Sequence, residues 1–105
     1  MLRIYTVVLQ LIRDLRPVIE AIETHDRDLG RQARRALSSV PLNMQEAAGS
    51  SRGNRRARYE SAYGSCREVR AVVDTAVAFE YVPTLEREVE ERLIHVVCTL
   101  RKLAA

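Results

Sequence analysis

Seven arginines near the middle of the chain are the side chains whose type and spacing best suit chemistry. They form two groups, Arg31, Arg34 and Arg35, then Arg52, Arg55, Arg56 and Arg58. Residues 31–70 carry a net charge of +6, whereas residues 1–30 and 71–105 carry −1 and −2. Because a guanidinium holds phosphate or carboxylate oxygens through two parallel hydrogen bonds, the clustering predicts an anionic partner. A general preference of the chain for arginine over lysine is the alternative.

The second group surrounds the expected start of a helix. Residues 50–54 form the clearest predicted loop, Asn54 is the expected N-cap, and no acidic residue occurs from Ser50 to Arg58. A helix N-terminus is already partly positive, so each cation there costs about 0.3–1 kcal/mol at low salt. Free backbone amides and four guanidiniums would make a good phosphate or acidic-side-chain site. A basic turn that is merely solvated is the alternative.

The first group lies at the start of another predicted helix. In an antiparallel bundle the two groups fall at opposite ends, so they cannot share a pocket within one subunit unless the chain folds back at Pro41. They could instead line a long stripe or meet across subunits. Tyr59 and Tyr63 could stack on bases beside the arginines, but Tyr59 falls on the apolar spacing, which favours a core position.

Patterns expected of an enzyme or metal site do not occur. There is no Gly-rich phosphate loop and no plausible Ser/His/Asp set, and neither histidine follows an acidic residue at the Glu-x-x-His spacing of di-iron bundles. His95 and Cys98 share a helix face, but a structural zinc needs two more ligands. The sequence therefore predicts no catalytic residue, metal or cofactor.

Composition predicts one small helical domain spanning residues 1–105. Four Gly and three Pro among 105 residues leave little material for β-turns. Charged residues interrupt every apolar run, so no segment should span a membrane. Cys66 and Cys98 form no Cys-x-x-Cys pair and the N-terminus does not resemble a signal peptide, so we expect a cytoplasmic protein with reduced thiols.

Four amphipathic helices are expected from the apolar spacing. They run from about Leu2 to Thr24, from an Asp26 N-cap to about Gly49, from Asn54 to about Phe79, and from a Thr84 N-cap onward. The apolar positions of the four faces are Ile4, Val8, Leu11, Leu15, Val18 and Ile22; Leu29, Ala33, Leu37, Val40, Met44 and Ala47; Tyr59, Ala62, Cys66, Val69, Val73 and Ala76; and Leu85, Val89, Leu93, Val96, Leu100 and Leu103. Short connections between such helices predict an all-α, antiparallel up-down-up-down four-helix bundle.

Three residues disturb these helices. Pro17 and Pro41 each remove a backbone hydrogen bond, so each is expected to kink or divide its helix. Gly64 costs about 1 kcal/mol relative to alanine, which predicts a compensating close approach of the second helix near Asn43. A polar cluster is expected there, formed by Asn43, Glu46, Ser65 and Glu68.

The central motifs resemble those of the four-helix-bundle family encoded in 23S rRNA intervening sequences. That family has a Gln-x-x-Arg-Ala stretch leading into Ser-x-Pro-x-Asn-x-x-Glu-Gly, then Ala-x-Gly-Ser-x-x-Glu. The matching residues are Gln32, Arg35, Ala36, Ser39, Pro41, Asn43, Glu46, Ala62, Gly64, Ser65 and Glu68. Ala47 stands where the family usually has glycine.

The resemblance implies a small bundle that assembles into a homo-oligomeric ring, commonly a pentamer. It also implies similarity to the accessory variability proteins of diversity-generating retroelements, which are basic, bind nucleic acid and contact a reverse transcriptase. We therefore expect a non-enzymatic oligomer that binds RNA or DNA through its arginines, beside a reverse transcriptase or another partner enzyme. The alternative is a structural or protein-interaction ring that binds no nucleic acid.

Overall fold

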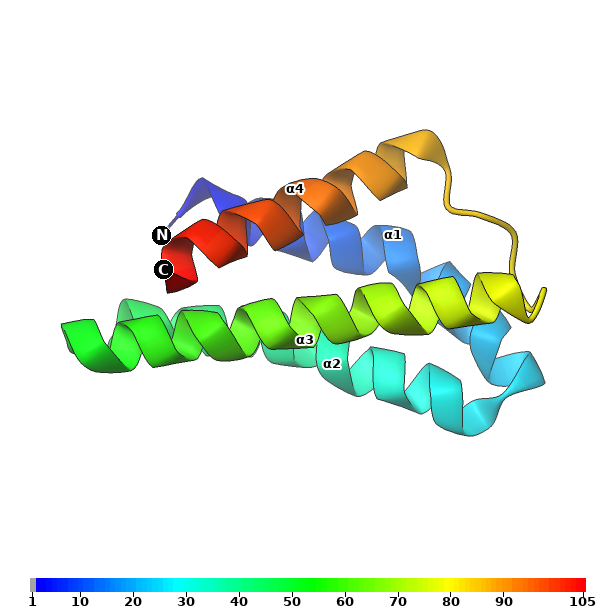
Figure 1. The fold of residues 1–105 in the computed structure, drawn as a ribbon, viewed down its shortest axis with the longest axis horizontal. Helices are drawn as coiled ribbons and strands as arrows, with labels where there is room; N and C mark the ends of the chain where they lie inside the picture. Colours follow the sequence, from blue (N-terminus) through cyan, green and yellow to red (C-terminus); the bar gives the residue numbers. More distant parts are fainter. Residues whose placement is uncertain (1) are drawn as a thin grey trace.

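Four α-helices in antiparallel order make up the computed structural model, which describes residues 2–105 (Figure 1). The helices are α1 Arg3–His25, α2 Arg27–Ala48, α3 Arg52–Ala78 and α4 Arg87–Ala104. The starts of α1 and α3 lie at one end of the bundle, and the starts of α2 and α4 lie at the other. No strand occurs in residues 2–105. The predicted all-α, up-down-up-down bundle is therefore confirmed.

The core follows the predicted apolar faces with small shifts. Each helix packs against two neighbours, in the cyclic order α1, α2, α3, α4. All six predicted core positions of α3 are buried. In α1, Ile19 occupies the core position that was predicted for Val18, and Val18 is only half-buried. Leu29, Leu85, Val89 and Leu103 are also half-buried, and Leu85 lies in the connection before α4. Neither Pro17 nor Pro41 divides its helix.

One of the three predicted helix caps is correct. Asp26 alone separates α1 from α2, and its carboxylate accepts a 3.0 Å hydrogen bond from the backbone N–H of Leu29. Asn54 lies inside α3 instead, because the helix begins a turn earlier with a 2.7 Å bond from the Arg55 N–H to the Ser51 carbonyl. Thr84 lies in the extended connection that precedes α4.

A small polar group joins α2 to α3. The Ser39 and Ser65 hydroxyls lie 2.8 Å apart, and the Asn43 amide donates at 2.9 Å to both the hydroxyl and the carbonyl of Ser39. The prediction was right for Asn43 and Ser65. It was wrong for Glu46 and Glu68, which are exposed and make no side-chain hydrogen bond in the described part of the chain.

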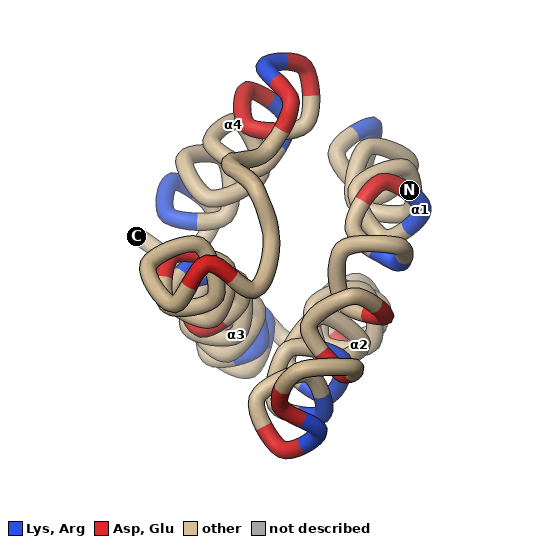
Figure 2. Tube along the Cα trace, turned by 90° about the vertical axis from the view of Figure 1, so that its right-hand side faces the viewer, with Lys and Arg blue, Asp and Glu red and all other residues tan. Residues whose placement is uncertain are grey.

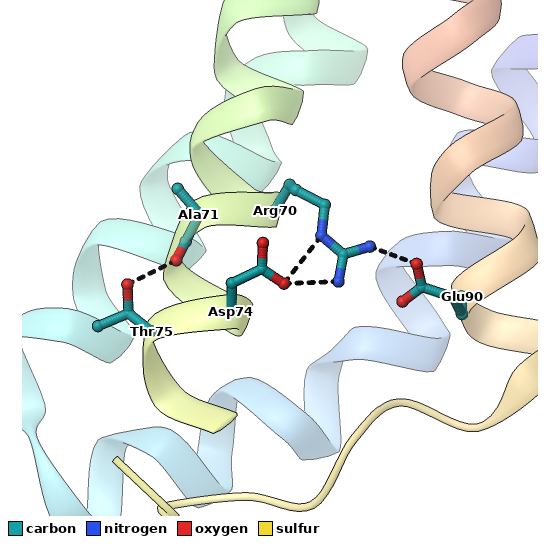
Figure 3. Close-up of polar contacts among 5 residues, drawn as sticks. All are labelled: Arg70, Ala71, Asp74, Thr75 and Glu90. Atoms are coloured by element: carbon teal, nitrogen blue, oxygen red, sulfur yellow. Dashed lines mark hydrogen bonds and ion pairs between the residues drawn. The ribbon is translucent and has the colours of Figure 1, made fainter. Parts of the chain in front are cut away.

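Ion pairs fasten α4 to its two neighbours. The Arg70 guanidinium of α3 donates twice to Asp74, at 3.1 and 2.8 Å, and once to Glu90 of α4 at 2.7 Å (Figure 3). On the other side, Arg92 of α4 binds Asp14 of α1. These half-buried arginines are therefore used within the fold.

The close helix contact occurs at Gly30, and the prediction of one at Gly64 was wrong. A Cβ at residue 30 would lie 2.2 Å from Cγ of Glu23 and 3.1 Å from its backbone N and Cα, whereas one at residue 64 would meet nothing within 4 Å. The single-residue turn at Asp26 presses the first turn of α2 against the last turns of α1.

Replacing the two glycines should therefore have opposite effects on the free energy of unfolding. Gly30→Ala must displace the Glu23 side chain and crowds the Glu23 backbone, so it should destabilise the fold by about 1–3 kcal/mol. Gly64→Ala adds a methyl group in open space and should stabilise it by about 1 kcal/mol through helix propensity. Urea unfolding followed by circular dichroism measures both values. A destabilising Gly64→Ala would contradict the open environment.

The two thiols should differ in reactivity. Burial among apolar side chains raises the pKa of Cys66 to about 12, so this thiol stays protonated at neutral pH, whereas Cys98 is exposed. A disulfide reagent at pH 8 should titrate one thiol in the folded protein and two in urea. The Cys98→Ser variant should show none until it unfolds, and a fast-reacting thiol in that variant would contradict the burial of Cys66.

Candidate nucleic-acid interface

The first two turns of α3 project from the bundle. Residues 51–58 are all exposed, and Tyr59 is the first buried residue of the helix. Figure 1 shows this segment reaching past the start of α1 and the end of α4. The Ser51 side chain makes no capping bond and the first turn holds no acidic residue. The start of α3 is therefore neither packed nor electrostatically stabilised by its own sequence.

The four arginines of this segment form no ion pair with a carboxylate of residues 2–105. The ion pairs of residues 2–105 involve Arg34, Arg70, Arg87 and Arg92, and none of Arg52, Arg55, Arg56 and Arg58. Two shallow hollows flank the helix. One, of about 620 Å³, lies between Arg52, Arg56 and the end of α4, and the other, of about 300 Å³, lies beside Leu2 and Ala48. Arg55 lines both hollows.

Tertiary structure adds three cations that the sequence reasoning missed. Arg3 lies in the first turn of α1, and Arg101 and Lys102 lie in the last turn of α4, at the same end of the bundle as the start of α3. All three are exposed. The antiparallel order of the helices was the signal that could have placed them there.

The same antiparallel arrangement partly offsets the positive charge at the start of α3. The C-terminal ends of α2 and α4 lie at this end of the bundle, and their free carbonyls are partly negative. These carbonyls reduce the repulsion between the arginines and the positive end of the α3 dipole. They do not remove it, because the basic residues still outnumber the acidic residues Glu46 and Glu60 nearby.

The first arginine group lies at the opposite end and is largely neutralised. Arg34 binds Glu23 through two hydrogen bonds of 3.1 and 2.8 Å, which lower the pKa of that carboxyl. Arg31 lines a shallow hollow with Glu20 and Glu23, and Arg35 is exposed. Residues 20–35 contain four acidic side chains and four arginines. The predicted groups therefore remain separate, and only the start of α3 has a strong positive excess.

Tyr59 and Tyr63 have different environments. Tyr59 is 6% exposed and packs in the core, as the apolar spacing predicted. Tyr63 is half-buried, and the Arg67 guanidinium lies 5.8 Å from its ring centre. This stacked pair continues the arginine-bearing side of α3 toward the middle of the molecule, and the sequence reasoning did not single out Arg67.

Two further features of the described residues bear on function. Within residues 2–105, no three His, Cys, Asp or Glu side chains gather closely enough to hold a metal ion. None of the helices in that range is both long and apolar enough to cross a membrane.

Comparison with known proteins identifies one family. A family model described as 23S rRNA-intervening sequence protein matches residues 2–102. The match spans all four helices and includes the α2–α3 contact at Ser39 and Ser65. Neither the curated proteins nor the solved structures give a match.

An acidic residue at the start of α3 should stabilise the helix and weaken anion binding. Arg52→Glu places a negative charge in the first turn and should strengthen it by about 0.3–1 kcal/mol at low salt. Slower amide hydrogen exchange in residues 53–58 would show this effect, which salt should reduce. Unchanged or faster exchange at low salt would mean that Arg52 does not destabilise the first turn of α3.

Proposed function

The chain belongs to the 23S rRNA-intervening sequence protein family, and we propose that it is a non-enzymatic module that binds RNA through the start of α3. The observation that carries the proposal is the group of exposed arginines Arg52, Arg55, Arg56 and Arg58 on a projecting helix, none of which forms an ion pair within residues 2–105. Such a row can follow a phosphate backbone while the free amides of the helix start face the same anion.

The geometry suits a flexible polyanion better than a small ligand. The two hollows beside Arg55 are shallow, and the guanidiniums stand in water, so little surface of a small molecule would be covered. A nucleic-acid strand instead gains affinity by releasing counterions at each phosphate contact. The Tyr63 and Arg67 pair offers a place for a base to stack farther along α3.

Assembly follows from the family resemblance. We propose a cytoplasmic homo-oligomer, of which a pentameric ring is the form that the resemblance implies, working beside a reverse transcriptase or another enzyme. In such a ring several copies of the α3 start could engage one strand. Binding at one copy then raises the effective concentration of RNA at the next, and avidity exceeds the affinity of one copy.

A structural module is the second candidate. The described residues are basic around the start of α3, whereas residues 74–91 hold six acidic side chains and one arginine. These opposite charges could pair between subunits without nucleic acid. Under this alternative the four arginines would hold the assembly together and would have no effect on RNA.

Neutralising the arginines should lower the salt dependence of RNA binding. With Arg52, Arg55, Arg56 and Arg58 changed to Gln, the slope of log affinity against log salt should fall by about 0.7 for each arginine that contacts phosphate in single-stranded RNA. Fluorescence anisotropy with labelled RNA and DNA of mixed sequence at several salt concentrations measures the slope.

A matched variant provides the control. Changing Arg27, Arg31, Arg34 and Arg35 to Gln removes the same charge from the neutralised end and should alter the slope less. No RNA binding at low salt, or equal effects of the two variants, would argue against the proposal. Light scattering on both proteins separates the second candidate, because loss of the oligomer in the α3 variant would indicate subunit pairing.

A further inference from the structure

Three aromatic rings stack where α3 ends. The Tyr81 ring lies 5.1 Å from His25 at an interplanar angle of 4°, and 5.3 Å from Phe79 at 14°. These three residues, here called the aromatic corner, join the end of α1 to the connection between α3 and α4. Aromatic pairs at such spacings attract one another, so the rings support a fixed surface.

The backbone beneath the aromatic corner is a tight helix stop. The Tyr81 N–H donates to the Ala76 carbonyl and the Glu80 N–H donates to the Val77 carbonyl, both at 2.9 Å. This is the Schellman arrangement, which needs a left-handed residue after the helix. Glu80 takes that position with φ of 62°, although glycine usually does. The turn brings the Phe79 and Tyr81 rings together, with the exposed Glu80 between them in the chain.

The outermost ring is exposed, and the chain on either side of it is rich in acidic residues. Phe79 is 65% exposed, although a phenylalanine gains by burial. Residues 74–91 carry six acidic side chains, of which Asp74, Glu88, Glu90 and Glu91 are held in ion pairs by Arg70, Arg87 and Arg92. Glu80 and Glu86 make no ion pair within residues 2–105. Figure 2 faces this end of the molecule and shows acidic positions on the end of α3 and the start of α4.

We propose that the aromatic corner docks an arginine-rich segment of a partner protein. A guanidinium can stack on the free face of Phe79 while Glu80, the next residue in the chain, accepts a hydrogen bond from it or its neighbours. Glu86, at the start of α4, adds a second carboxylate at the same end of the bundle. Both carboxylates repel a phosphate backbone or an anionic lipid surface. An exposed ring alone would fit several partners, but a ring next to a carboxylate that forms no ion pair in residues 2–105 fits a cation.

The source of the cationic segment rests on the proposed function. The basic start of α3 lies at the opposite end of the bundle, so it cannot reach the aromatic corner of its own chain, and it is occupied when RNA is bound. The exposed Arg27, Arg31 and Arg35 lie at the same end as the aromatic corner but are fixed within α2. The docking segment is therefore assigned to another protein, and a second copy of this chain is an outcome that the test distinguishes. One bundle could then hold RNA at its basic end and a basic protein at its acidic end.

Anisotropy with a labelled nine-residue oligoarginine peptide and the full chain tests the proposal. The wild-type protein should bind the peptide at low salt, and more tightly than an oligolysine of equal length. Phe79→Ala should weaken binding about two- to fivefold, the range that a surface cation–π contact gives. Changing Glu80 and Glu86 to Gln should reduce the salt dependence of binding.

Two variants match these changes elsewhere on the surface. Leu42 is 66% exposed, so Leu42→Ala removes a comparable apolar side chain, and changing Glu46 and Glu60 to Gln removes two charges from the opposite end. Both should leave peptide affinity nearly unchanged. No binding by the wild-type protein, or equal effects of the matched variants, would overturn the proposal.

Two further measurements distinguish a basic partner protein from a second copy of this chain and from RNA at the aromatic corner. Light scattering without peptide should give the same mass for wild type and Phe79→Ala; a loss of mass in the variant would mean that a second copy occupies the corner and would overturn the proposal. RNA affinity should be unchanged by Phe79→Ala, and a weaker affinity would overturn it too. Failure of the wild type to bind RNA would remove the proposed function, whereas the docking site is judged by the peptide affinities of its own variants.

Discussion

The antiparallel packing of α2 against α3 is the contact on which the rest of the structure depends. It is the most extensive contact between any two helices of the described chain, and both helices bury small residues, among them Ala36 and Ala62. The part-buried hydroxyls of Ser39 and Ser65 lie within hydrogen-bonding distance across the interface. A shift along the helix axis would separate the two hydroxyls and remove the partner of Ser65, whereas Ser39 would keep its bond from Asn43 within α2. The contact therefore favours one alignment of the two helices as well as their proximity.

That alignment divides the charge of the molecule. Because α2 and α3 run in opposite directions, their basic starts lie at opposite ends. At one end Glu23 holds Arg34, and the surrounding acidic residues balance the rest of that group. At the other end the start of α3 is joined by the basic last turn of α4. A single sequence window rich in arginine thus becomes one neutral surface and one strongly positive surface.

The positive surface is also the part of the fold with the least packing. Residues 51–58 bury no side chain, and an isolated helical turn gains little stability without tertiary contacts. The free carbonyl ends of α2 and α4 offset part of the repulsion there. An anion that bound the arginines would offset more, so binding and local helix stability should rise together. The aromatic corner at the opposite end does not need a bound ion for its local stability, because its turn is fixed by backbone hydrogen bonds and stacked rings.

The sequence by itself determined the helices, because an apolar residue every three or four positions can be buried only on a helix face. It also determined the Asp26 cap, a local hydrogen bond, and the core position of Tyr59. The Asn54 cap was mispredicted because α3 begins a turn earlier through the local bond from the Arg55 N–H to the Ser51 carbonyl, without a side-chain cap. The Thr84 cap was mispredicted because the extended connection continues to Glu86. Only the tertiary structure decided that Gly30 is the close contact, that Arg34 is paired, and that Arg101 and Lys102 join the start of α3. Each depends on which helix ends meet, and contacts between residues far apart in the chain leave no periodic signal in the sequence.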